Sequence, residues 1–394
     1  SSRPSHFKAV DFNGFFLLSK AWFTRCIFKI AFYEKIAYSA GSQRTKGALR
    51  MKKPYKKRFS KPLAYKKSFQ RPKTPTFAAI DLGTTNCRLL VATPTPAGFA
   101  VRETFSRITR LGEGLISTGN LSERAIKRTI SALKLCAKKL EKYRLAGTRF
   151  VATEACRRAK NGVEFINRVK KEAGIDLEII SFEEECRLGV AGCVPLINRK
   201  IRHALVFDIG GGSTEVSWAK IDDSNTVCLE GALSFPLGVI TVSEGFTGKG
   251  LSSAAYRAVV GKVVSYLQPF EDKFGISNVI AQGDVQMIAM SGTVTTIGAF
   301  HLGLPEYNRA VVDGLALSYD DLAKAKRKLE KLPFAEKEAH PCIGPQRADL
   351  TLPGCAILQG ICEMWPIGEV TIADRGLREG VLLDLIRLHG KEKK

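Results

Sequence analysis

One short pattern occurs twice in the chain, and this repetition constrains the fold more than any other feature. The apolar residues 77–80 lead into Asp81-Leu-Gly-Thr-Thr-Asn86, and the apolar residues 204–207 lead into Asp208-Ile-Gly-Gly-Gly-Ser-Thr-Glu215. In both copies an aspartate ends a predicted buried strand, a glycine follows two residues later, and a second strand begins after the hydroxyl side chains. The repetition predicts an α/β protein made of two similar domains.

The two turns have the composition of phosphate-binding loops. Glycine has no side chain and can adopt positive φ, so the backbone N–H groups of such a turn can point at phosphate oxygens. A single loop of this kind would be read as a plain hairpin turn, but a second copy with an aligned aspartate favours a phosphate site. We therefore predict that phosphate is bound by Gly83 and Thr84 in the first copy and by Gly210, Gly211, Gly212 and Ser213 in the second.

The two aspartates call for a different partner. Asp81 and Asp208 would repel phosphate, so we expect them to hold Mg²⁺ or another divalent cation, or its water ligands. A third strand, at 287–290, ends in Ser-Gly-Thr, and residues 294–302 are predicted to form a helix whose N-terminus faces an anion. The three strand ends together predict a site between the two domains.

Charged residues also cluster at two predicted strand-to-helix junctions. Glu183, Glu184 and Glu185 fall in the first turn of one helix, where acids are favourable near the helix dipole without any further role. Glu184 and Glu185 lie about 100° apart around the helix, so only one of them can face a given site. Arg157 or Arg158, at the other junction, could clamp phosphate, with a surface ion pair as the alternative.

These stretches resemble those of a known family. The motifs DLGTTN, ATEACR, IISFEEECRL, FDIGGGSTE, SFPLGV, SGTVTTIGA, RADLTLPG and DRGLREG are similar, in the same order, to those of the exopolyphosphatase / guanosine pentaphosphate phosphohydrolase (Ppx/GppA) phosphatase family in a short two-domain form. The resemblance spans residues 77–388. It implies duplicated actin-like ATPase (ribonuclease H-like) domains with an active-site cleft between them, and we expect domain I at 77–201 and domain II at 202–394.

The resemblance also implies roles for single residues. Glu185 matches the catalytic glutamate that activates water, and Asp208 and Glu215 match acids associated with the metal and catalysis. Arg157 matches an arginine that contacts phosphate. The phosphate loops correspond to those predicted above, with Asp81 in the first of them. The sequence departs from the family at Phe182, where glycine is frequent, and at Cys186, where alanine is usual, and Phe182 is expected to narrow the pocket.

The implied function is hydrolysis of terminal phosphoanhydride bonds. The first expectation is an exopolyphosphatase that releases orthophosphate from inorganic polyphosphate, and the alternative is a guanosine pentaphosphate/tetraphosphate phosphohydrolase. A third hypothesis is a non-catalytic polyphosphate or alarmone sensor. The presence of Glu185, Asp208 and Glu215 argues against it, because a protein that only binds would not need a base. The family resemblance makes a homodimer the expected assembly.

The net charge of +23 lies mainly in the N-terminal segment. Residues 1–76 hold 19 Lys and Arg but only two acids, Asp11 and Glu34. Such a segment is predicted to be disordered and either to contact polyanions such as polyphosphate or RNA or to act only as a solubilising tail. Met51 is the first methionine, so residues 1–50 are expected to precede the native start, with a targeting segment as the rival hypothesis.

The remaining composition excludes several classes. The ten cysteines form no C-x-x-C pair and only five histidines are present, which excludes most zinc-site spacings. The cysteines are expected to be reduced thiols, which places the protein in the cytoplasm. The sequence has no run of 18 apolar residues, so no transmembrane helix is expected.

Overall fold

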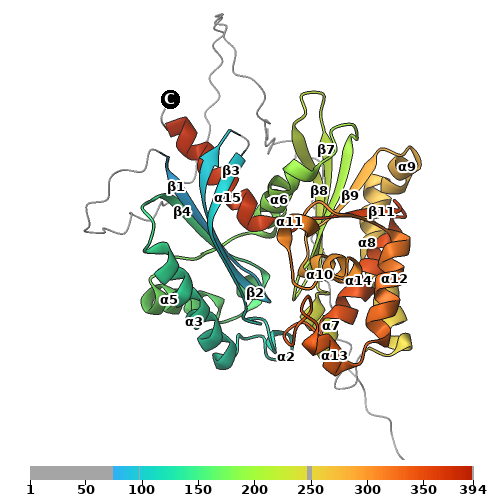
Figure 1. The fold of residues 1–394 in the computed structure, drawn as a ribbon, viewed down its shortest axis with the longest axis horizontal. Coiled ribbons are helices and arrows are strands. Elements are labelled where there is room, and N and C mark those ends of the chain that lie inside the picture. Colours follow the sequence, from blue (N-terminus) through green and yellow to red (C-terminus); the bar gives the residue numbers. More distant parts are fainter. Residues whose placement is uncertain (1–73, 97, 246–250, 393–394) are drawn as a thin grey trace, which may run out of the picture.

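The computed structural model describes residues 74–96, 98–245 and 251–392. These residues form two lobes that lie side by side, each built around one β-sheet (Figure 1). The predicted basic tail lies outside the described residues except for 74–76, the last of which begins the first strand.

The first lobe has a five-stranded sheet in the order β3-β2-β1-β4-β5. The first three strands form an antiparallel meander, and β4 and β5 continue the sheet in parallel to β1. The strands are β1 (Thr76–Leu82), β2 (Asn86–Thr95), β3 (Gly98–Ile108), β4 (Leu145–Ala152) and β5 (Glu178–Ile179). The helices that follow them are α2 (Leu115–Thr118), α3 (Glu123–Leu140), α4 (Glu154–Arg158), α5 (Gly162–Ala173), α6 (Phe182–Cys193) and the 3-10 turn Val194–Leu196.

The second lobe has a six-stranded sheet in the order β10-β11-β9-β6-β7-β8. Its strands are β6 (His203–Ile209), β7 (Thr214–Ile221), β8 (Val227–Phe235), β9 (Val285–Ala289), β10 (Ala316–Ser318) and β11 (Glu369–Ile372). Its helices are α7 (Val239–Gly245), α8 (Ser253–Phe274), α9 (Ile276–Ala281), α10 (Gly292–His301), α11 (Arg309–Val312), α12 (Tyr319–Lys331), α13 (Phe334–Ala339) and α14 (Thr351–Met364). The last helix of the chain is α15 (Leu377–Glu392).

The two sheets share one topology. β6, β7, β8, β9 and β11 stand in the same spatial order as β1, β2, β3, β4 and β5, and β10 adds an edge strand to the second sheet. The registers agree as well, because Asp81 pairs with Arg88 between β1 and β2 as Asp208 pairs with Glu215 between β6 and β7. The predicted duplicated α/β fold is confirmed, and the aspartates occupy equivalent positions in it.

Amphipathic helices cover the first sheet in the way that their sequences dictate. The hydroxyl of Ser122 caps α3 by accepting a hydrogen bond from the amide of Ala125, and the apolar face of the helix, including Ile126, Ile130 and Leu133, packs on one face of the sheet. The helix ends at Leu140, and β4 begins five residues later at Leu145.

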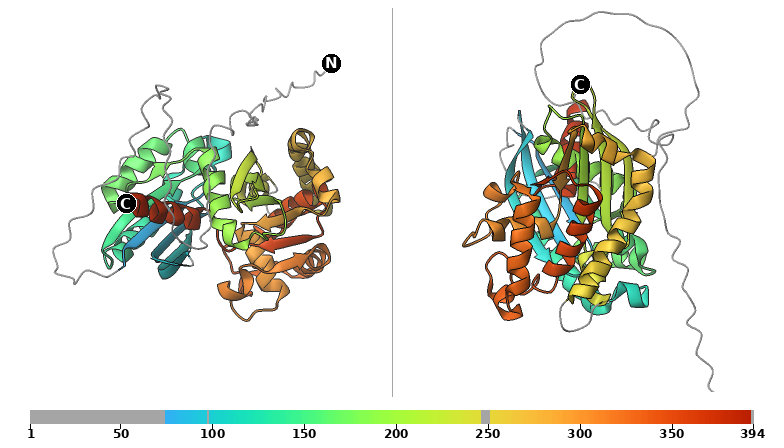
Figure 2. Two further views of the ribbon diagram at one scale, coloured as in Figure 1. Left: turned by 90° about the horizontal axis from the view of Figure 1, so that it is seen from above. Right: turned by 90° about the vertical axis from the view of Figure 1, so that its right-hand side faces the viewer.

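The other face of the first sheet is covered by α15, and this corrects the predicted domain boundary. Residues 202–394 were expected to form the second domain, but Val381, Leu382 and Leu385 of α15 are buried against Phe77 and other apolar side chains of the first sheet. Both views in Figure 2 show α15 beside the strands of the first lobe. The chain thus returns to the first lobe at its end, and α15 lies against α6 between the two sheets.

Close helix contact explains two glycines at this junction. A Cβ atom at Gly380 of α15 would lie 1.9 Å from the carbonyl oxygen of Leu188, and one at Gly192 of α6 would lie 2.0 Å from that of Gly376. Only glycine lets the two backbones approach so closely. Within the described part of the chain, none of the helices has the length and apolar character required to span a membrane.

Candidate active site

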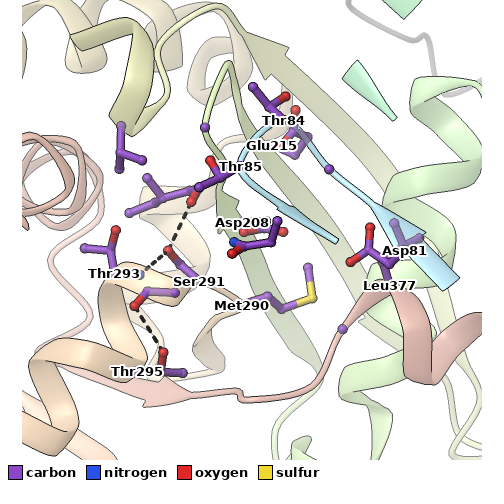
Figure 3. A pocket seen from close by; sticks show the side chains of 18 of the residues that line it. Asp81, Thr84, Thr85, Asp208, Glu215, Met290, Ser291, Thr293, Thr295 and Leu377 are labelled. Carbon is purple, nitrogen blue, oxygen red and sulfur yellow. Dashed lines mark hydrogen bonds between the residues drawn. The ribbon is translucent and has the colours of Figure 1, made fainter. Parts of the chain in front are cut away.

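A cleft between the lobes collects most of the residues that the sequence singled out. Figure 3 shows Asp81 from the first lobe and Asp208 and Ser291 from the second around this cavity. Of the predicted site residues, those that line it are Asp81, Gly83, Thr84, Glu185, Asp208, Gly210, Gly211, Ser213 and Glu215. Gly212, Arg157 and Phe182 are not among the lining residues, so Phe182 does not narrow the cleft as expected.

The two glycine-rich turns are closed by the same backbone hydrogen bond. The amide of Gly83 donates to the carbonyl of Asn86 at 2.9 Å, and the amide of Gly210 donates to that of Ser213 at 3.0 Å. None of the predicted loop glycines adopts the positive φ that motivated their prediction. Close approach accounts for Gly211, because a Cβ there would lie 2.1 Å from the Thr85 hydroxyl oxygen of the opposite lobe. The two loops therefore touch across the cleft.

The cleft holds four carboxylates in a poorly solvated space. Burial raises the pKa of Glu185 to about 7 and that of Asp208 to about 7, and it also raises the pKa of Asp81. Burial, with the neighbouring Glu185 and Asp208, raises the pKa of Glu215 well above its usual range. Each acid disfavours ionisation of the others, so the group gains from any cation that enters the cleft.

Glu185 is held in place by Arg157. Its position at the start of α6 is set by Ser181, whose carbonyl accepts from the Glu185 amide and whose hydroxyl accepts from the Glu184 amide. Nη1 of Arg157 donates to Oε2 of Glu185 at 2.6 Å and to the Ile180 carbonyl at 3.0 Å. Because its guanidinium is engaged with this carboxylate rather than lining the cleft, the geometry favours a positioning role over the predicted phosphate contact.

The neighbouring Glu184 has a different environment. Its carboxylate pairs with Arg149 at 2.8 Å and with Arg187 at 2.8 Å, on the side of α6 that faces β4 and α15. These ion pairs belong to the packing of the first lobe. Only Glu185 of the two adjacent acids reaches the cleft, as the helix geometry requires.

Two serine hydroxyls converge on Glu215. The Ser213 hydroxyl donates to Oε1 of Glu215 at 2.5 Å, and the Ser234 hydroxyl on β8 donates to the same oxygen at 3.1 Å. Ser213, predicted to bind phosphate, therefore has its hydroxyl on a carboxylate in this structure. Ser234 was missed by sequence reasoning because it follows Glu215 by 19 residues and meets it only through strand pairing.

Two arginines, which form a basic wall, line the same cleft as the acids, and sequence reasoning missed both. Arg88 of β2 and Arg347, which precedes α14, both line the cleft. A Cβ added at Gly292, the first residue of α10, would lie 3.9 Å from Nη2 of each. Burial and the neighbouring Arg88 lower the pKa of Arg347, whose Nη1 donates to the Thr296 hydroxyl at 2.9 Å.

This wall is suited to an anion. The N-terminus of α10, capped by Ser291, adds backbone N–H groups to the two guanidiniums. Helix α10 begins at Gly292 rather than at the predicted residue 294. A signal for Arg88 was present in the sequence, because Arg88 follows Asp81 by seven residues as Glu215 follows Asp208.

Oxygen atoms in the same cleft fit a hard divalent cation. Asp81 and Asp208 come from the two lobes, and the buried Thr85 Oγ1 and Asn86 Oδ1 have no hydrogen-bond partner among the described residues. No three His, Cys, Asp or Glu side chains in the described ranges are grouped so as to hold a metal ion by themselves. This arrangement suits Mg²⁺, which takes one or two carboxylates and fills its other positions with water and phosphate oxygens.

Comparison with known proteins identifies the family to which the chain belongs. The family model of the Ppx/GppA phosphatase family matches residues 92–389. A curated Haemophilus influenzae protein named "Putative exopolyphosphatase" is 28% identical over 314 residues, covering 78% of this chain and 90% of that protein.

Solved structures agree with this match. A crystal structure titled as an exopolyphosphatase-like protein has a TM-score of 0.73 and 28% identity, and the match covers 81% of this chain and 100% of that one. The Aquifex aeolicus member of the Ppx/GppA family has a TM-score of 0.64 and 27% identity, with coverage of 80% and 99%. The chain with its interlobe cleft belongs to the Ppx/GppA phosphatase family.

Proposed function

We propose that this chain is an exopolyphosphatase, which hydrolyses the terminal phosphoanhydride bond of inorganic polyphosphate and releases orthophosphate. The observation that carries the proposal is that one cleft holds both acidic and basic side chains. Asp81, Asp208, Glu185 and Glu215 line it together with Arg88 and Arg347, whose guanidiniums lie near the start of α10. A chain of phosphates with its bound cation requires both kinds of group.

The basic wall would bind the phosphate chain. Arg88, Arg347 and the amides at the start of α10 would donate hydrogen bonds to the oxygens of the terminal phosphoryl group and fix its orientation. Asp81 and Asp208 would hold a divalent cation such as Mg²⁺, which when bound neutralises negative charge on phosphate oxygens.

Glu185 is the proposed general base. Its carboxylate lines the cleft and is oriented by Arg157, and its pKa of about 7 suits proton transfer near neutral pH. It would take a proton from a water molecule in line with the terminal phosphorus atom. Glu215, fixed by two serine hydroxyls, would add negative charge beside the cation and help to orient the attacking water.

Polyphosphate is favoured as the substrate because the Haemophilus influenzae relative is named a putative exopolyphosphatase and the similar solved structure is that of an exopolyphosphatase-like protein. Guanosine pentaphosphate and tetraphosphate present the same terminal bond to the cleft and form the principal alternative. Eight cysteines in the described part of the chain are free thiols, which supports the proposal of a reducing, cytoplasmic setting; they are Cys87, Cys136, Cys156, Cys186, Cys193, Cys342, Cys355 and Cys362.

The test is orthophosphate release with Mg²⁺ from long polyphosphate, tripolyphosphate and guanosine pentaphosphate in parallel, with Glu185→Gln as the control. We expect release from polyphosphate that Glu185→Gln loses. A preference for guanosine pentaphosphate would replace the proposed substrate with the alternative. Tight binding of all three without release would replace the hydrolase with a sensor.

A further inference from the structure

An ion pair bridges the two lobes at the side of the cleft. Nη1 of Arg110, in the loop between β3 and α2, donates to Oδ2 of Asp349 at 2.9 Å, and Nη2 donates to Oδ1 at 2.7 Å. Nη2 also donates to the carbonyl of Gln346 at 2.8 Å. Two parallel N–H···O bonds between a guanidinium and a carboxylate fix direction as well as distance. The pair therefore fixes how one loop of each lobe lies against the other.

On the first lobe, the loop of Arg110 is attached to a phosphate loop. The amides of Thr109 and Arg110 both donate to the carbonyl of Thr85, at 2.8 and 2.9 Å, and the amide of Gly112 donates to that of Thr84 at 3.1 Å. Arg128 donates to the carbonyls of Thr109 and Arg110 from the opposite side. A shift of Arg110 would thus be transmitted to the loop that lines the cleft.

The backbone at Arg110 is unusual for its residue type. Its φ is 46°, in the left-handed region that residues other than glycine rarely adopt. Such a conformation persists only where surrounding contacts hold it, and it is found most often at functional positions. Here it accompanies the guanidinium that reaches across to Asp349.

On the second lobe, Asp349 lies two residues after Arg347. The backbone turn that carries both is closed by hydrogen bonds from the amides of Arg347 and Ala348 to the carbonyl of Gly344, at 3.2 Å each. The Arg347 guanidinium contacts Thr296 and faces the start of α10. The ion pair therefore connects the loop of Thr84 and Thr85 in the first lobe to Arg347 in the second lobe.

We propose that Arg110 and Asp349 are positioning residues for substrate binding, which set the distance between the first phosphate loop and Arg347. This inference rests on the proposed function, because it assumes that a phosphate chain occupies the cleft. The pair touches neither Glu185 nor Arg157, so breaking it should raise KM and change kcat little. Both partners are about a third exposed, at 28% and 33%, so the pair contributes little to the stability of the folded protein.

The experiment compares Arg110→Asp, Asp349→Arg and the double variant that exchanges the charges. Aspartate tolerates the left-handed conformation at position 110 better than most residues do. Each single variant should raise KM for tripolyphosphate about tenfold, with kcat and the melting temperature close to wild type. The double variant should recover most of the loss. Arg124→Ala is the matched control, because Arg124 pairs with Glu113 of the same loop at 2.7 Å within one lobe.

Calorimetric binding of tripolyphosphate separates this inference from the proposed function. If the wild-type protein binds tripolyphosphate but releases no orthophosphate, only the proposed hydrolase function is overturned. The effect of exchanging the two charges on binding could still be measured from the dissociation constants. Single variants that bind and turn over like wild type would overturn the positioning role. A double variant no better than the single ones, at an unchanged melting temperature, would also contradict it.

Discussion

Arg88 and Glu215 occupy equivalent positions in the two lobes, and this difference in residue type places a cation beside one aspartate and a further acid beside the other. Each faces an aspartate across a strand pair, Asp81 in the first lobe and Asp208 in the second. Arg88 opposes the rise in the pKa of both aspartates, whereas Glu215 adds to the crowding of negative charge. The duplicated scaffold thus places a guanidinium from one lobe and a carboxylate from the other at equivalent positions of a single cleft.

The ionisation of Glu185 should control the pH dependence of turnover. A general base acts only when ionised, so kcat should rise as the pH increases through about 7, the pKa to which burial raises Glu185. Arg157 opposes this rise, so Arg157→Ala should move the acid limb of the kcat profile to higher pH. Glu185→Gln should lower kcat by about 10²–10⁴-fold and leave substrate binding in place.

The measurement is kcat at saturating substrate from pH 5.5 to 9 in wild type, Arg157→Ala and Arg157→Lys. The lysine variant keeps a positive charge and should shift the limb less than the alanine variant does. An acid limb at the same pH in all three proteins would show that the ionisation of Glu185 does not set the rate.

The sequence predicts which single residues lie in the site better than it predicts the hydrogen-bond partners of those residues. Glu185, Asp208 and Asp81 were located because each follows a strand or begins a helix in a recognisable pattern. The contact of Arg157 with Glu185 spans 28 residues, and that of Ser234 with Glu215 spans 19. Such contacts depend on helix placement and strand pairing, which no local pattern encodes.

At the scale of elements, α6 and α15 determine where Glu185 lies. The two helices pack through glycine, with the site of a Cβ at Gly380 only 1.9 Å from the Leu188 carbonyl oxygen. Because α6 begins with the turn that carries Glu185, any separation of the helices moves the proposed base. The strands and α3 were predictable from apolar periodicity, but the return of α15 to the first sheet is a long-range packing choice.

Gly380→Ala should therefore destabilise the protein and reduce turnover together. Overpacking at a backbone contact typically costs about 1–3 kcal/mol, so the melting temperature should fall by several degrees. Gly390→Ala is the matched control in the same helix, because nothing lies within 4 Å of its added Cβ. Thermal unfolding and kcat measured on both variants check this, and equal behaviour of the two would refute the role of helix contact.

At the scale of the whole molecule, the proposed partner of the basic N-terminal segment is a polymeric anion. Residues 51–73 contain ten Lys and Arg and no acid. Deleting them should raise KM for long polyphosphate and flatten its dependence on salt, since fewer counterions are exchanged on binding. Tripolyphosphate carries far fewer charges than the long polymer and should be affected little. An unchanged salt dependence for the long polymer would reduce the segment to a solubilising tail.

The two-lobed plan was the most predictable feature of the molecule because the duplicated turns mark it directly. The residues of the basic wall were harder to predict, because Arg88 lies in a strand and Arg347 lies in a turn 259 residues later in the chain. Arg347 contacts α10 within the second lobe, whereas Arg88 reaches the start of α10 only across the interface between the lobes.

Isotope transfer from water shows which phosphorus atom is attacked and whether Glu185 is required. Tripolyphosphate is hydrolysed with Mg²⁺ in water enriched in ¹⁸O, and the orthophosphate and pyrophosphate products are examined by mass spectrometry. Attack of water on the terminal phosphorus predicts one ¹⁸O atom in orthophosphate and none in pyrophosphate, and Glu185→Gln should yield neither product above background. Label in pyrophosphate rather than orthophosphate, or full turnover by Glu185→Gln, would contradict the account.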